Sequence, residues 1–540
     1  MQKDKLSLHY QASLQDQYDC TDRIVINGYI PKLQMPGGFR NWYRDFNGDD
    51  KDLVQSRLIK FAGRYSRRIY AFAEKKGIPV IECKTEQRKH QIARQYLPKD
   101  KNSSGLFLIL KSRASAFIWE IETSKNGSIN IKRKQGFVNH YYFHIMDKQW
   151  GHVTIRMCSH PPFNCMIILN GHELTERKLT KKNILFEKTD NCFTAYDDGA
   201  ALTQVADTCS IGQLEGVCNL WIAGCLWFGI DYDAQQRTDL KYRYSIYQVE
   251  YSRNFLFKQG AQLDQVYQSI IDQTRRNLNV ERIKTMFGKK YRPHYSKSGN
   301  SALQVRVEIP DYNLTVFKIH FEALTLKLYD KGERTLQAEV VVHNTKDLKC
   351  KRGIEHFGTI CKKLKNMMQS FLDNLLYAHV ATIASGELQY LVNCQERGNQ
   401  KISGVNPFKK MDIWVMHAVM AVCFKPFGFS TSDVVQKLKK MYGLNLKPTQ
   451  AAYVLRKLKA KKILRIQKGK RKYHASPKGL QIILAAIVIT EQQLPKMLAC
   501  CNNNDIAKVP VLKKNYRDVY FELKHAIKDF VKISPVKIAA

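Results

Sequence analysis

The sequence predicts an α+β multidomain protein. A mixed α/β and antiparallel-sheet N-terminal region is followed by a smaller C-terminal domain of helices and one basic hairpin. The length of 540 residues suits several domains of roughly 100–200 residues each. A composition of 44% hydrophobic and 11% aromatic residues excludes a disordered chain. Helical and extended apolar patterns follow one another along the chain, which indicates mixed secondary structure.

Residues 1–104 are expected to form an α/β domain. Near its start, DRIVINGYI predicts a short strand, and apolar positions at helical spacing predict a helix over 52–77 that stops at Gly77. The apolar run IPVIEC predicts a buried strand, and a second helix is expected over 85–97 with Thr85 as its N-cap. Helix, strand and helix in succession indicate layered α/β structure.

Residues 105–287 change to an antiparallel, β-rich pattern. Extended runs punctuated by Gly, Asn and Asp fill 105–195, as hairpins require. A helical region over 200–230, a strand over 242–257 and a helix over 261–277 follow. This part is therefore expected to be a β-rich domain with added helices.

A third α+β domain is expected over 302–392. The stretch 288–301 is rich in Gly, Pro, Ser and basic residues and predicts the linker before it. Inside the domain, a hairpin over 324–344 is expected to turn at Asp330-Lys331-Gly332. An amphipathic helix over about 353–376 completes it.

Positive charge is concentrated at the C-terminal end. The chain has 87 Lys and Arg against 48 Asp and Glu, a formal charge of +39. Residues 401–540 alone hold 28 Lys and Arg against seven acidic residues, and 493–540 are expected to be a basic extension. Such an excess on a globular chain indicates a polyanionic partner. The 14 cysteines form no C-x-x-C pair, which predicts reduced thiols rather than a zinc or disulfide framework.

Residues 407–492 carry the strongest motif, three helical segments followed by a basic hairpin. The segments are Met411–Phe424, TSDVVQKLKKMY and TQAAYVLRKLKAK; Ser430 or Ser432 caps the second, and Gly443 ends it. ILRIQ and KYHAS predict two short strands joined by the basic turn KGKR. A closing helix, LQIILAAIVIT, is expected after SPKG.

This order of elements resembles the winged helix-turn-helix family, as found in MarR-like regulators. The resemblance implies that the third helix lies in the major groove of duplex DNA and that the hairpin is a wing reaching phosphate or minor groove. The implied DNA-binding residues are Thr449, Gln450, Tyr453, Arg456, Lys457 and Lys459 on the helix, and Lys468, Lys470, Arg471 and Lys472 on the wing. A winged helix that binds protein or packs domains together is the alternative.

Five of the 15 histidines fall close together in the sequence: His140, His144, His152, His160 and His172. Alternation along a strand puts the first two on one face of a sheet. Imidazoles from neighbouring strands can converge on one divalent ion, so these five are candidate metal ligands. Mg²⁺ or Mn²⁺ is the candidate cofactor, with His140 and His144 as candidate catalytic residues. The alternative is a sheet whose histidines and aromatics satisfy one another.

The hairpin LTLKLYDKGERTLQAEVVVHN is similar to part of phage and plasmid replication initiators, where a strand with K-x-Y-D-K precedes one with an acidic residue. The similarity implies Tyr329 as a nucleophile that attacks DNA and Glu339 as a metal-binding or structural carboxylate. An ordinary β-hairpin is the alternative. Glu250 and Arg253 interrupt an aromatic strand and indicate a buried ion pair or a part of the same site.

Three classes of function remain. The first is a protein that reads duplex DNA with its winged helix, in gene regulation or in a mobile element, with a homodimer as candidate assembly. The second is a metal-dependent DNA-processing enzyme (nickase, replication initiator or nuclease), so enzymatic activity stays open. The third is an RNA-binding or scaffolding protein with stacking aromatics such as Tyr141, Tyr142, Tyr242 and Tyr244.

The sequence also predicts where the chain is found. Its longest apolar runs fall short of the ~20 residues that span a bilayer, and the N-terminus has no apolar signal segment. We therefore expect a cytoplasmic, nucleoid-associated protein with no membrane partner.

Overall fold

The computed structural model describes residues 4–494 apart from short gaps, together with Glu522 and His525. The expected linker and most of the basic extension lie outside the described residues. The gaps are 85–86, 101–102, 125–127, 278–285, 288–307, 310–315, 322–323, 333, 380–386, 398–399 and 467–470.

The chain forms two compact units, which we describe separately. The first comprises Met1, Gln11–Asp264 and Lys284–Met368, and the second Gln2–Tyr10, Gln265–Ile283 and Gln369–Ala540. The predicted mixed α/β composition is confirmed. One sheet runs through residues that the sequence divided at 104/105 and near 302, so these expected domain boundaries cut through it.

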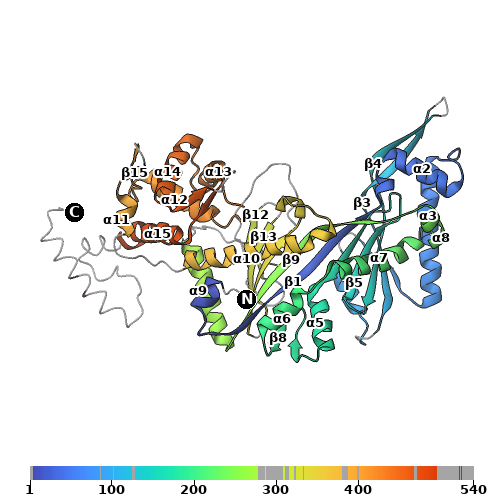
Figure 1. Ribbon diagram of the computed structural model, residues 1–540, viewed down its shortest axis with the longest axis horizontal. Helices are drawn as coiled ribbons and strands as arrows, with labels where there is room; N and C mark the ends of the chain where they lie inside the picture. Colours follow the sequence, from blue (N-terminus) through green and yellow to red (C-terminus); the bar gives the residue numbers. More distant parts are fainter. Residues whose placement is uncertain are drawn as a thin grey trace. The chain divides into compact units, whose positions relative to one another are not determined.

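The first unit is built on a 12-stranded sheet (Figure 1). Its strand order is β10-β11-β12-β13-β14-β9-β1-β6-β5-β4-β3-β2, antiparallel throughout except for the pairs β10/β11 and β2/β3. The strands are β1 (Leu14–Tyr29), β2 (Val80–Glu82), β3 (Gly105–Thr123), β4 (Ile129–Asp147), β5 (Gly151–Cys158), β6 (Cys165–Asn170), β9 (Arg243–Phe257), β10 (Met286–Phe287), β11 (Glu308–Ile309), β12 (Val316–Phe321), β13 (Leu324–Asp330) and β14 (Thr335–Val342).

Strand β1 is longer than the sequence predicted. DRIVINGYI indicated a short strand, but β1 begins at Leu14 and pairs with both β6 and β9 in the middle of the sheet. From Gln17 onward polar and apolar residues alternate, as they do in surface strands, yet Gln17, Tyr18, Asp19 and Cys20 are all buried. The polar side chains are buried because partners on neighbouring strands and on helices satisfy them.

The strand expected at IPVIEC is present, but most of it is not buried as predicted. It forms β2 (Val80–Glu82) at the edge of the sheet, where Val80 and Ile81 are half-buried and Glu82 is exposed. Only one neighbour, β3, pairs with it among the described strands. An edge position leaves one side of a short apolar strand open to solvent.

Helices cover the faces of this sheet. The expected helix over 52–77 is confirmed as α3, and Gly77 ends it in a left-handed conformation at φ 64°. The helix expected over 85–97 is shorter, α4, and its expected cap Thr85 lies outside the described residues. The helices of this unit are α2 (Pro36–Asn47), α3 (Gln55–Lys76), α4 (Lys89–Gln95), α5 (Gly171–Lys181), α6 (Gly199–Asp207), α7 (Ile211–Trp227), α8 (Tyr232–Arg237) and the first half of α10 (Phe357–His379).

The sequence predicted strands throughout residues 105–195, but α5 forms a helix within them. A small hairpin, β7 (Phe186–Lys188) and β8 (Phe193–Tyr196), lies after α5. Helix α9 (Gly260–Asn277), most of which belongs to the second unit, matches the helix expected over 261–277. The hairpin over 324–344 is confirmed as β13 and β14. It turns at Asp330-Lys331-Gly332, and Gly332 has a φ of 99° that favours glycine.

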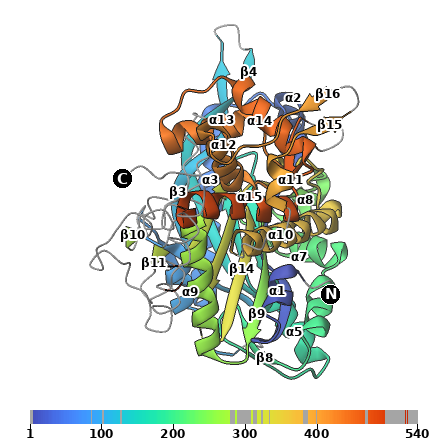
Figure 2. The same ribbon diagram turned by 90° about the vertical axis from the view of Figure 1, so that its left-hand side faces the viewer.

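The second unit contains a bundle of short helices and small hairpins, grouped around α12, α13 and α14 (Figure 2). Ser430 caps α13 in a reciprocal pair with Asp433, and Gly443 ends it at φ 68°. Residues Phe429 and Tyr473 form a bridge beside the β17–β18 hairpin. The elements are α1 (Lys5–His9), α11 (Glu387–Val392), β15 (Gln395–Arg397), β16 (Gln400–Ile402), α12 (Lys410–Val422), α13 (Thr431–Tyr442), α14 (Pro448–Ala460), β17 (Leu464–Ile466), β18 (Tyr473–Ala475) and α15 (Pro477–Ile487).

Candidate functional site

The central strands of the first unit align two rows of polar side chains on one face of the sheet. The register places Cys20 (β1), Ser252 (β9), Glu339 (β14) and Lys327 (β13) in one row. The adjacent row contains Tyr18, Asn254, Gln337 and Tyr329 on the same four strands. Residues two apart on a strand share a face, so both rows lie on the same side. We call these eight residues, with Asp22, Glu250 and His172, the polar face.

At one end of the polar face, Glu339 is the centre of an ionic cluster. Lys327 Nζ lies 3.0 and 2.9 Å from its two carboxylate oxygens, and the Tyr329 hydroxyl donates to Glu339 Oε2 at 3.2 Å. Burial raises the pKa of Tyr329 well above its ordinary value, and Glu339 and Asp22 add to the effect. Tyr329 is therefore a neutral phenol whose proton points at a carboxylate.

Glu250 adds a second carboxyl group to this cluster. Burial, followed by the negative charge of Glu339, raises the pKa of Glu250 to about 7. Burial lowers the pKa of Lys327, but the negative charges of Glu339 and Glu250 have the larger effect, so the pKa of Lys327 is raised overall. A carboxyl group that titrates near neutral pH beside a phenol and an ammonium group can give or take a proton.

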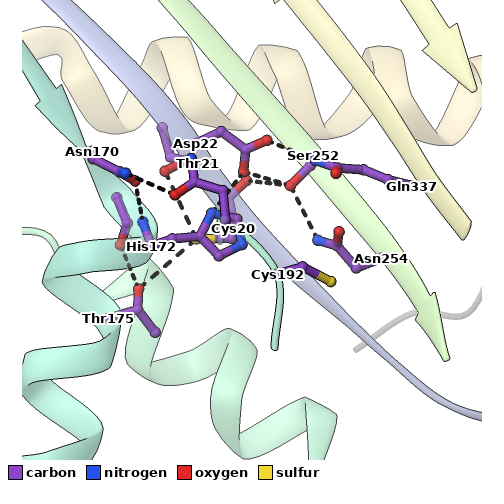
Figure 3. Close-up of polar contacts among 12 residues, drawn as sticks. Cys20, Thr21, Asp22, Asn170, His172, Thr175, Cys192, Ser252, Asn254 and Gln337 are labelled. Carbon is purple, nitrogen blue, oxygen red and sulfur yellow. Dashed lines mark hydrogen bonds and ion pairs between the residues drawn. The ribbon is translucent and has the colours of Figure 1, made fainter. Parts of the chain in front are cut away.

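At the other end of the polar face, Asp22 and His172 meet (Figure 3). His172 comes from the first turn of α5, where Asn170 Oδ1 accepts its backbone N–H at 3.0 Å. The ring atom His172 Nδ1 lies 3.1 Å from Asp22 Oδ1. Asp22 accepts hydrogen bonds from the Ser252 hydroxyl at 2.6 Å and from the Gln337 amide at 2.8 Å. Cys20 completes the group from the same strand as Asp22.

The opposite face of β1 and β9 carries a buried ion pair. Arg253 donates to both carboxylate oxygens of Asp19, from Nε at 2.7 Å and from the guanidinium Nη2 at 2.8 Å. Asp19 is 0% and Arg253 1% exposed, and the Tyr251 hydroxyl also donates to Asp19 at 3.0 Å. The sequence left open whether Glu250 and Arg253 pair or belong to the Tyr329 site. The structure puts them on opposite faces, with Arg253 paired to Asp19 and Glu250 beside Glu339.

The structure separates the five histidines that were candidate metal ligands. His144 Nδ1 and His152 Nε2 are 3.0 Å apart on β4 and β5, whereas His140 lies near the Val138 carbonyl and His160 near the Ser159 hydroxyl. His172 lies on α5 in the polar face. Burial lowers the pKa of His140 to about 4 and that of His144 to about 3, so both rings are neutral at physiological pH. The expected convergence of all five on one ion is therefore not found.

The sequence placed Tyr329 and Glu339 in one candidate site, and the two side chains are in contact in the structure. The rest of the polar face was not predicted as a site. Cys20, Asp22 and Ser252 were not predicted, and His172 was predicted with other partners. One signal was present: Tyr18, Cys20 and Asp22 follow one another at the two-residue spacing of a strand face.

Of the aromatic residues proposed for RNA stacking, Tyr141 is buried and Tyr142, Tyr242 and Tyr244 are half-buried. Tyr141 is 0% exposed. The Tyr242 hydroxyl donates to the Phe163 carbonyl at 2.8 Å, and its ring stacks on Tyr244. Buried rings cannot stack on bases. Tyr141 is therefore excluded as a stacking residue, and RNA binding by the three half-buried rings stays a prediction.

The DNA-binding residues expected in the second unit are partly exposed on α14. Thr449, Gln450, Tyr453 and Arg456 are exposed, and Lys459 is half-buried. Leu455 and Leu458 are buried on the other side of the helix. On the hairpin, Arg471 is exposed and Lys472 half-buried, while Lys468 and Lys470 lie outside the described residues.

The structure corrects the prediction for Lys457. It was expected to face DNA, but it is 5% exposed and its Nζ lies 3.0 Å from Asp412 Oδ2. Asp412 also accepts the backbone N–H of Asn406 at 2.9 Å. Lys457 lies two positions before Lys459, on the side of α14 that packs inward, and Asp412 on α12 neutralises its charge.

Replacing Lys457 by methionine is expected to destabilise the helices of the second unit by about 3 kcal/mol, because Asp412 stays buried without its cation. Amide hydrogen exchange of α12, followed by mass spectrometry, should accelerate by about a hundredfold. Exposed Lys439 on α13 is the matched control, and Lys439→Met should leave exchange unchanged. Adding Asp412→Asn to Lys457→Met should restore much of the protection. Weakened DNA binding by Lys457→Met with unchanged hydrogen exchange would instead indicate that Lys457 contacts DNA.

Comparisons with protein-family models, with curated proteins and with solved structures each found no match. The class of this protein is therefore described from its structure. It is a mixed α/β protein with an ionisable cluster on a mainly antiparallel sheet, followed by a basic helical unit. Among the described residues, every helix is too short or too polar to traverse a lipid bilayer.

Proposed function

We propose that the chain is a DNA-binding protein that reads duplex DNA with its second unit, in which α12–α15 and the β17–β18 hairpin act as a winged helix. One observation carries this proposal. Thr449, Tyr453 and Arg456 are exposed at helical spacing on α14, with Gln450 beside them, while Ala451, Leu455 and Leu458 on the other face are buried. A helix anchored in this way can present one polar face to the edges of base pairs.

The side chains exposed on α14 are suited to that role. An arginine fork reads guanine bidentately, and a glutamine amide reads adenine. The hairpin beside α14 exposes Arg465 and Arg471, which can contact phosphates. The net charge of the last 140 residues adds a salt-dependent attraction to any duplex.

Arg456→Ala is expected to weaken binding to a preferred site by about 10- to 100-fold, which is the usual value of a lost bidentate base contact. The probe is a fluorescent duplex selected by the protein from a random-sequence pool, compared with an unselected duplex at fixed salt. Lys351→Ala, at an exposed position of the first unit, removes the same charge as a control. It should weaken both duplexes equally and slightly.

Two results would overturn the proposal. One is a random pool that yields no enriched sequence. The other is an Arg456→Ala variant that binds both duplexes like the control, because the exposed face of α14 would then read no bases.

A second candidate function, DNA processing, is favoured by one contact, the Tyr329 phenol 3.2 Å from Glu339. In this scheme the Tyr329 oxygen forms a bond to a backbone phosphorus while one P–O ester bond breaks. The phenolic proton passes to the Glu339 carboxylate, and the leaving sugar oxygen takes a proton from water. Lys327 holds Glu339 in place for this transfer.

A further inference from the structure

We propose that Cys20, Asp22 and His172 bind a zinc ion within the core of the first unit. Their donor atoms all lie within 4.8 Å of one another. Among the described residues, no other group of three His, Cys, Asp or Glu side chains brings its donor atoms this close together. The inference does not depend on DNA binding or on DNA processing.

The hydrogen bonds of His172 determine which ring nitrogen faces the group. The Tyr18 hydroxyl donates to Cys192 Sγ at 3.8 Å and accepts the Phe193 N–H at 2.9 Å. Its 3.2 Å contact with His172 Nε2 is therefore one in which the imidazole donates. This tautomer leaves an unprotonated lone pair on Nδ1, which lies 3.1 Å from Asp22 Oδ1.

Two lone pairs at this distance repel each other unless a cation lies between or beside them. A proton shared by Nδ1 and Asp22 is poorly placed, since His172 Nδ1 makes no hydrogen bond within the described part of the chain. Both side chains are buried, at 0% and 6% exposure, so solvent does not screen the repulsion. A metal ion accepts both lone pairs, and Cys20 supplies a third donor at the same point.

The surroundings of the group are those of a metal site. Imidazoles that bind metals donate their second N–H to a partner, as His172 does to Tyr18, and ligating carboxylates are held by other donors, as Asp22 is by Ser252 and Gln337. Two more buried oxygens nearby, Asn254 Oδ1 and Gln337 Oε1, have no hydrogen-bond partner among the described residues (Figure 3).

The donor set selects zinc. Thiolate with imidazole and carboxylate suits Zn²⁺, whereas Mg²⁺ and Mn²⁺ prefer oxygen ligands alone. Three protein ligands leave one tetrahedral position for water. Because the ligands are buried, the ion must enter during folding, and a chelator should remove it slowly from the native protein and rapidly in denaturant.

The test uses full-length protein produced in cobalt-supplemented minimal medium. Tetrahedral Co²⁺ bound by a thiolate gives intense visible bands and a near-ultraviolet charge-transfer band, which report the cysteine directly. We expect one equivalent of metal per chain, by elemental analysis, and both spectral features. Cys20→Ser should abolish the charge-transfer band, and His172→Gln should lose the metal.

Two cysteine variants are controls. Cys192→Ser removes a buried thiol from the same region, and Cys394→Ser removes an exposed thiol that could bind metal adventitiously. Both should keep the bands and the metal. Circular dichroism establishes that Cys20→Ser is folded; if it is not, the wild-type bands and their retention in both controls still decide the question. Wild-type protein without the bands, or Cys20→Ser with them, would overturn the assignment.

Discussion

Replacing Arg253 by methionine is expected to destabilise the first unit by about 3–5 kcal/mol. Methionine fills much of the same volume, but Asp19 then keeps its negative charge in a site that is 0% exposed. The Tyr251 hydroxyl still donates to the Asp19 carboxylate, whereas Thr203 accepts the backbone N–H of Asp19 and does not offset the carboxylate charge. A single buried charge that loses its cation costs more than the net value of the pair, because its desolvation is no longer offset.

Urea unfolding measures this effect. Five of the six tryptophans lie in the first unit, so Trp414→Phe in all variants makes tryptophan fluorescence report that unit alone. Arg243→Met is the matched control, because Arg243 is an exposed arginine on the same strand, β9. It should change the stability by less than about 0.5 kcal/mol.

Two further variants separate charge from packing. Arg253→Lys keeps the charge but loses the bidentate geometry, so its loss of stability should be intermediate. Asp19→Asn added to Arg253→Met removes the stranded charge while an amide can still accept from Tyr251, and it should recover most of the loss. If Arg253→Met is no less stable than Arg243→Met, the buried pair does not contribute to the fold as the geometry indicates.

Local signals made α3, α13 and the 324–344 hairpin predictable. Gly77 and Gly443 end helices in left-handed conformations, and Ser430 caps α13, all within a few residues of the positions they specify. These features depend on short stretches of chain. Propensity and spacing therefore identified them without knowledge of the rest of the fold.

Long-range pairing made the polar face unpredictable. Cys20 and Ser252 are adjacent only because β1 and β9 pair, across more than half of the first unit's sequence. Asp22 lies at an irregularity in this pairing, between Thr21 and Arg23, which no local pattern indicates. Tyr329 and Glu339 were predictable because one tight turn joins their strands.

Lys457 shows the same limit on a helix. Helical spacing indicates which positions lie near one another, but it does not show that the inward face of α14 meets an acidic residue on α12. A lysine on a predicted DNA-binding helix is normally taken as a phosphate contact. Here Asp412, 45 residues earlier in the chain, determines its role instead.

If the chain processes DNA, Tyr329→Phe is expected to reduce its nicking of supercoiled plasmid by at least about a thousandfold, as loss of a nucleophile does. Phenylalanine keeps the ring and removes only the oxygen that would bond to phosphorus. The assay follows conversion to open circle with Mg²⁺ or Mn²⁺ added, and detects protein that stays attached to DNA after detergent denaturation. Wild-type protein should give both products and Tyr329→Phe neither.

The neighbours of Tyr329 give a graded series. Glu339→Gln can still accept a hydrogen bond but is a poor base, so nicking should slow while attachment to DNA remains detectable. Tyr232→Phe, at a tyrosine that is 50% exposed in the same unit, is the matched control and should nick like wild type. Far-ultraviolet circular dichroism like that of wild type shows that each variant is folded, and if α14 binds DNA as proposed, duplex affinity should be unchanged in all three variants. Equal nicking by Tyr329→Phe would exclude Tyr329 as the nucleophile, and no nicking by wild type with either ion would leave DNA binding without chemistry as the function.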